Sequence, residues 1–178
     1  QIDDDRVKVS GARGTPAPDQ LKAVITWLDG YRGGHILTFY GFDATEKASR
    51  FADAAIQRSA GILRDKNMAG FSATSIEILG NESQYGKQAT VKNAREVCVK
   101  IAARHEKEAG IAILLREITG LALSGPPGLS GFAGTRPRPS PVMALFSCLL
   151  PRENAPLTIH YGSLSEEFRQ PAVSKSQK

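Results

Sequence analysis

Residues 106–123 carry the strongest periodic pattern in the sequence. Apolar side chains recur there at spacings of three and four residues, which predicts an amphipathic α-helix with one buried face; they are Ile111, Leu114, Leu115, Ile118, Leu121 and Ala122. Ser124, Gly125 and the two prolines that follow end this helix, because proline cannot continue it. A helix with one apolar face must be covered by a second layer, so the segment requires a layered domain.

Alternating apolar and polar residues predict strands around that helix. Residues 94–104 alternate most clearly, with Val97, Val99 and Ile101 inward and Lys100 outward. Residues 71–79 predict a further strand before them. After the helix, residues 142–150 are apolar on both faces, which predicts a central strand covered on both sides.

The N-terminal part of the chain predicts a similar arrangement. A short strand is expected at residues 6–9, and strands at 21–28 and 36–41 are joined by a glycine-rich turn at 29–34, as in an antiparallel hairpin. A second helix begins at Asp43, which we expect to cap it together with Glu46, and this helix should end near residues 65–67.

This order of elements predicts an α+β fold. We expect a mostly antiparallel sheet with two helices on one face, built from two successive hairpin-plus-helix units. Residues 1–164 are predicted to form a single domain, and the polar residues 165–178 a disordered tail. The chain begins with Gln1 rather than methionine, so we expect a fragment whose partner is the remainder of a longer chain.

Composition excludes several classes of function. The net charge of +5 and pI near 9.4 suit an acidic ligand, but the basic residues form no block and no aromatic RNA-binding motif accompanies them, so no nucleic-acid partner is predicted. No stretch approaches the roughly 18 apolar residues of a membrane span. Two cysteines in apolar strand patterns, Cys98 and Cys148, indicate a reducing, cytoplasmic location. The three histidines share no metal-ligand spacing, so no metal site is predicted.

Two glycine-rich loops are the candidate binding elements. Residues 125–139 combine exposed backbone N–H groups with two arginines, and residues 10–14 repeat the combination on a smaller scale. If both loops lie at one end of the sheet, their side chains converge on one anionic group; the candidate residues are Gly11, Arg13, Gly128, Gly131, Arg136 and Arg138. The alternative is that these loops are surface connections and structural turns.

One block of sequence carries a family resemblance. Residues 5–22, DRVKVSGARGTPAPDQLK, resemble a characteristic block of the acyclic terpene utilisation (AtuA-type) family. Later features follow in a similar order: Asp29-Gly30-Tyr31, Tyr40-Gly41, Ser124-Gly125-Pro126 and Pro151-Arg152-Glu153. The similarity covers residues 5 to 155 and corresponds to the C-terminal part of the family's core domain. Residues 129–132, LSGF, depart from the denser glycine run of the family.

The resemblance implies breakdown of acyclic terpenes such as citronellol and geraniol, whose intermediates are carried as CoA thioesters. It therefore implies a component of an acyl-CoA-processing enzyme, acting on an acidic small molecule by a reaction that the resemblance does not assign, and with no cofactor assigned beyond CoA as the carrier. No catalytic residue is carried over. The alternative is a non-catalytic assembly domain, which docks a missing N-terminal domain or a second copy in a homo-oligomer.

Overall fold

The structure is a computed structural model, and it describes residues 1–16, 18–131, 134, 136–155 and 157–168. The chain divides into two compact units. One unit comprises Trp27–Ala144, and the other joins Gln1–Thr26 to Leu145–Lys178. Among the described residues no helix is both long and apolar enough to cross a membrane.

The main sheet is antiparallel wherever its register is defined. Its strand order is β2-β3-β1-β4, and β5 also pairs with β1. These strands are β1 (Gln20–Tyr40), β2 (Ala73–Leu79), β3 (Glu96–His105), β4 (Leu129–Gly131) and β5 (Ser140–Pro151). The predicted α+β class with a mostly antiparallel sheet is confirmed.

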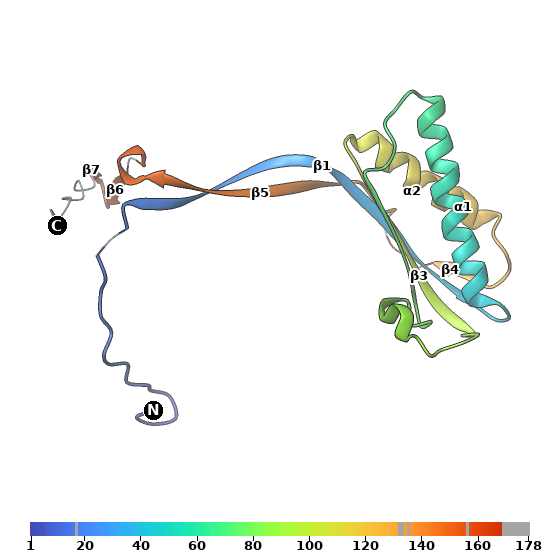
Figure 1. Cartoon of the computed structure of the whole chain (residues 1–178), viewed down its shortest axis with the longest axis horizontal. Helices are drawn as coiled ribbons and strands as arrows, with labels where there is room; N and C mark the ends of the chain where they lie inside the picture. Colours follow the sequence, from blue (N-terminus) through green and yellow to red (C-terminus); the bar gives the residue numbers. More distant parts are fainter. Residues whose placement is uncertain (17, 132–133, 135, 156, 169–178) are drawn as a thin grey trace. The chain divides into compact units, whose positions relative to one another are not determined.

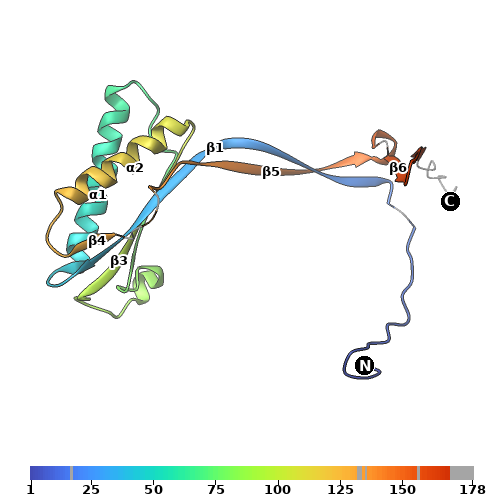
Figure 2. The ribbon, with the colours of Figure 1, turned by 180° about the vertical axis from the view of Figure 1, so that it is seen from behind.

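Two α-helices lie on the same face of the sheet in Trp27–Ala144, as both views show (Figures 1 and 2). They are α1 (Ala44–Asp65) and α2 (Glu108–Leu123), and both follow the predicted stripes. Four of the predicted positions of α2 are buried, namely Ile111, Leu114, Leu115 and Ile118. They pack in one core with sheet residues such as Phe39, Val99 and Ile101 and with alanines of α1, whose small side chains allow close helix–sheet approach.

The predicted first hairpin is wrong, because residues 29–34 lie inside one continuous strand, β1. Gly33 and Gly34 serve close packing there rather than a turn. A Cβ at Gly33 would lie 2.4 Å from Ile111 Cγ2 of α2, and a Cβ at Gly34 would lie 2.3 Å from Ile101 O of β3. The second predicted unit is confirmed: β2 and β3 pair antiparallel and α2 follows.

The ends of several elements also differ from expectation. Residues 6–9 form no strand, and Asp43, at φ 55°, makes no side-chain capping hydrogen bond to α1. Short 3₁₀ segments occupy Ser83–Gln88 (η1) and Arg152–Asn154 (η2). Two strands that sequence patterns did not predict, β6 (Leu157–Tyr161) and β7 (Leu164–Phe168), pair antiparallel with each other. The single-domain boundary at residue 164 stays a prediction, and residues 169–178 of the predicted tail lie outside the described residues.

The expected position of β5 is also wrong. Its apolar residues predict a central strand, yet its one neighbour among the described strands is β1. Leu145, Phe146 and Leu149 are 69%, 55% and 62% exposed. Among the described residues, these apolar side chains of β5 therefore stay largely exposed.

Candidate functional site

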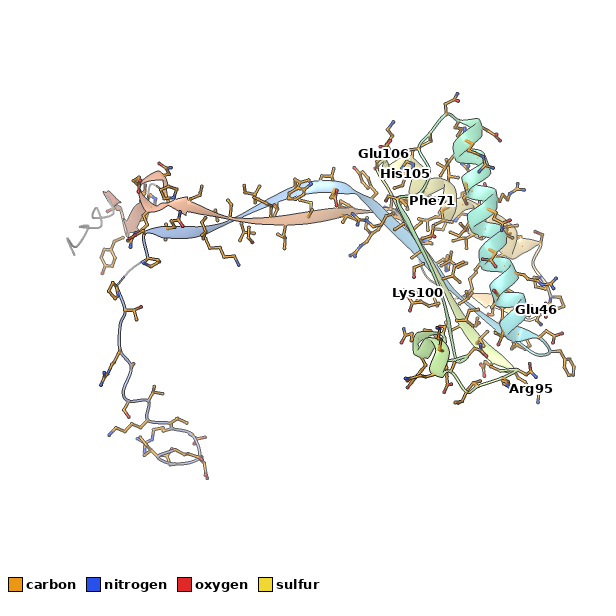
Figure 3. All side chains as sticks on the ribbon, in the orientation of Figure 1. Glu46, Phe71, Arg95, Lys100, His105 and Glu106 are labelled. Carbon is orange, nitrogen blue, oxygen red and sulfur yellow. The ribbon has the colours of Figure 1, made fainter. Side chains whose placement is uncertain are left out.

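A hollow of about 880 Å³ opens among residues of the sheet face that the helices leave uncovered. Cross-strand partners share a face, and the register pairs Gly34 with Ala102 and Ile36 with Lys100. Their neighbours Leu37, Val99 and Ile101 are buried, toward the helices. Figure 3 shows Lys100 leaving the sheet on the side away from the helices.

Small residues make the floor of this hollow. Gly34 has no Cβ and its partner Ala102 ends at Cβ, so the sheet surface is low between larger neighbours. Ile36, which is 51% exposed, adds an apolar wall, and Pro137 lies at the edge. The floor therefore suits an aliphatic group, which gains by leaving water.

Three cationic side chains from different elements line the same hollow: Arg32 of β1, Lys100 of β3 and Arg138 before β5. Lys100 Nζ lies 2.7 Å from Glu77 Oε1 of β2. Hydrogen bonds from Lys100 and then from Gln84 hold the pKa of Glu77 below its usual value, so this carboxylate stays ionised. In the part of the chain that the structure describes, neither Arg32 nor Arg138 has an ion-pair partner.

The two arginines of the predicted 125–139 loop line different hollows. Arg138 belongs to the hollow above. Arg136 lines a smaller one of about 380 Å³ against α2, together with Arg116, Thr119 and Leu123. The structure therefore does not bring Arg136 and Arg138 together at one hollow.

The loop glycines have packing roles. Gly128 has φ 96°, its carbonyl accepts the Tyr40 N–H at 2.9 Å, and a Cβ there would lie 2.3 Å from Tyr40 O. Gly131 belongs to β4 and pairs with Leu37. Lys47 Nζ donates to the Pro127 carbonyl at 3.0 Å, which fixes the turn to α1. A ligand role for these glycines stays a prediction.

Gly11 and Arg13 are exposed in the unit that contains residues 1–26. Gly11 has φ 78°, and a Cβ there would meet nothing within 4 Å, so its backbone is open to a partner. Arg136 belongs to the other unit. The convergence of Arg13 with Arg136 therefore stays a prediction.

Arg32 and Lys100 are functional candidates that the sequence patterns did not single out. Arg32 was hidden in the segment interpreted as a hairpin turn. Lys100 was placed on the outward face of its strand, but an outward lysine is ordinarily a solvated one. The signal that could have found both is the pair of consecutive glycines, Gly33 and Gly34, since glycine inside a strand marks close approach by another group.

His105 has a structural role at the start of α2. Its buried ring lies beside Phe71, and Figure 3 shows the two together. Nε2 donates to the Ala69 carbonyl at 2.9 Å, and Nδ1 lies 2.8 Å from the Lys107 backbone nitrogen, so both ring nitrogens have backbone partners. Among the described residues no group of His, Cys, Asp or Glu side chains is placed to hold a metal ion.

The sequence model of the family described as acyclic terpene utilisation family protein AtuA matches residues 1–161 of the chain. The chain belongs to this family. The family resemblance expected from residues 5–155 is thereby confirmed for this AtuA-family chain. No curated protein matches the chain.

Two solved structures are similar to parts of this AtuA-family chain. They are amidases of the hydantoinase/carbamoylase family from Burkholderia vietnamiensis and Burkholderia multivorans, each 16% identical with a TM-score of 0.35. The matches cover 67% and 71% of this chain, which spans 28% of each amidase chain.

Proposed function

We propose that this chain is the substrate-holding domain of an AtuA-family protein that acts in the cytoplasm on acyclic terpenoids or related acyl compounds carried as CoA thioesters. The observation that supports it is the hollow in which Arg32, Lys100 and Arg138 surround a floor of Gly34 and Ala102. Cations over an apolar floor match a ligand that joins an anionic group to an aliphatic body.

The two halves of such a ligand would be held by different forces. Arginine presents a planar fork that binds a carboxylate or a phosphate through two parallel hydrogen bonds. The aliphatic part would lie against Gly34, Ala102 and Ile36, where each buried CH₂ contributes about 0.8 kcal/mol. The hollow's volume of about 880 Å³ falls in the range of small-molecule sites. These residues would bind and orient the substrate.

The test is calorimetry of the full-length protein with CoA and a short-chain acyl-CoA. Replacing both Arg32 and Arg138 by alanine should weaken acyl-CoA binding by about ten-fold or more, since two charge-assisted contacts are lost. The control replaces two exposed arginines of α1, Arg50→Ala with Arg64→Ala, which removes the same charge away from the hollow.

A further double variant tests the alternative site predicted from the loops at residues 10–14 and 125–139. Binding that survives Arg32→Ala with Arg138→Ala, but is lost in Arg13→Ala with Arg136→Ala, would reject the hollow in favour of the loops. If both pairs bind as the wild type does, neither site holds the ligand.

The exposed apolar side chains of β5 support a second candidate function, an assembly domain. Leu145 and Leu149 lie on one face of the strand and Phe146 on the other, and all three are more than half exposed. Sedimentation of the full-length protein should show an oligomer that Leu145→Ser with Leu149→Ser, two changes on one face of β5, dissociates. A wild-type protein that stays monomeric at all concentrations would exclude self-assembly through this strand.

A further inference from the structure

Lys100 faces two competing partners. Its side chain lines the hollow, yet its Nζ already lies 2.7 Å from Glu77 Oε1. The two residues are direct cross-strand partners of β3 and β2, so the pair is set by the register of the sheet. Glu77 is held in turn by Gln84 Nε2, which donates to its other carboxylate oxygen at 2.9 Å.

The charges at the hollow are therefore not equivalent. Arg32 and Arg138 have no ion-pair partner among the described residues, whereas Lys100 is neutralised by a carboxylate of the protein itself. Anionic groups of a ligand can contact the two guanidinium groups without displacing a protein side chain. An anionic group placed beside Lys100 would have to displace Glu77 to reach it.

We infer that Glu77 is a specificity-determining residue that disfavours ligands with an anionic group beside Lys100. This inference rests on the proposed function, because it concerns the same hollow. Because Glu77 Oε1 lies 2.7 Å from Lys100 Nζ, a ligand carboxylate that contacts Lys100 competes with Glu77. Removing the charge of Glu77 makes Lys100 a third available cation, and ligands with a carboxylate at that point bind more tightly.

The experiment compares octanoate with octanedioate, two aliphatic acids that differ by one carboxylate. Calorimetry of the full-length protein should show tighter binding of octanoate. Glu77→Gln keeps the side-chain shape and should strengthen octanedioate binding by about three- to five-fold, the upper part of the range for an exposed ion pair, while octanoate binding changes by less than about two-fold.

Two variants separate this effect from a general change in charge. Glu96→Gln removes one carboxylate from β3 at a position that does not line the hollow, and it should leave the ratio of the two affinities unchanged. Glu77→Gln with Lys100→Met should show no gain for octanedioate, because the released cation is absent.

The outcomes distinguish failure of the proposed function from failure of the role assigned to Glu77. If the wild-type protein binds neither acid nor any acyl-CoA, the proposed function fails and this inference fails with it. If the wild type binds but Glu77→Gln and Glu96→Gln change both acids alike, the hollow stands and the role of Glu77 is overturned. An octanedioate affinity that rises in Glu77→Gln and returns to the wild-type level when Lys100→Met is added supports the inference.

Discussion

β3 and β5 are both apolar strands that pair with β1, but their side chains meet different surroundings. In β3 every second side chain, from Val97 to Ala103, is buried under the helices, while Lys100 remains available to solvent. In β5 the apolar residues Leu145 and Leu149 stay exposed. Alternating apolar and polar residues thus indicate a strand with one face buried by helices of the same unit. Uniform apolarity predicts burial of both faces, but it does not identify the element that would bury them.

Truncating one side chain in each strand should give the largest difference in the free energy of unfolding. Ile101→Ala in β3 should lower the free energy of unfolding by about 2–5 kcal/mol, because it leaves a cavity in a packed core. Leu145→Ala in β5 should cost less than about 0.5 kcal/mol, because its side chain is largely in water. Urea denaturation of both variants measures the difference. Equal losses would mean that β5 is covered in solution and that the contrast between the strands is false.

A second prediction concerns the junction between β3 and α2. Gly110→Ala would place a Cβ 2.3 Å from Cγ of the His105 ring, so we expect a loss of about 1–3 kcal/mol despite the better helix propensity of alanine.

His105→Ala removes that ring and should itself destabilise the protein. In the double variant, Gly110→Ala should then cost much less than it does alone, a coupling that a double-mutant cycle measures. Additive losses would show that the ring and Gly110 do not compete for the same space.

The smallest expected effect lies in the connection between β2 and β3. The Glu82 carboxylate accepts the backbone N–H groups of Thr90 and Val91 at 2.6 and 3.1 Å, and these bonds lower its pKa. A lowered pKa in the folded state means that this stabilisation is present above the unfolded-state pKa and is lost as the pH falls through the folded-state value.

Amide exchange at Thr90 and Val91 should therefore lose protection relative to β3 amides between about pH 6 and about pH 3, after correction for intrinsic rates. Glu82→Gln should abolish the pH dependence at these two amides alone. A profile that is identical in both proteins would assign the protection to something other than this carboxylate.

Much of the fold of Trp27–Ala144 could be predicted from sequence because its signals are local. The stripes of α1 and α2 and the alternation of β3 report directly on which face is buried. The hairpin at residues 29–34 was wrong for a physical reason. Consecutive glycines favour a turn, but they equally allow a strand to lie tightly between Ile111 and Ile101, and only the tertiary packing decides between the two.

The candidate site was less predictable. Arg138 stood out because it lies in a glycine- and proline-rich loop, where charge is conspicuous. Lys100 and Arg32 lie in strands, where an outward cation is ordinary, and their proximity depends on the β1–β3 register that the misplaced turn obscured. A site assembled across strands depends on pairings that no local pattern contains.

The dipeptide Gly33-Gly34 serves both surfaces of the sheet at once. Gly33 admits Ile111 of α2 on one side, and Gly34 keeps the floor of the hollow low on the other. The packing of α2 on the sheet and the depth of the hollow thus depend on two adjacent residues. A substitution that changes one of them is expected to affect the other. A design that fills part of the hollow with a larger side chain at Gly34 should therefore first replace Ile111 by a smaller residue. The β1 backbone could then shift toward α2 to make room for the new side chain.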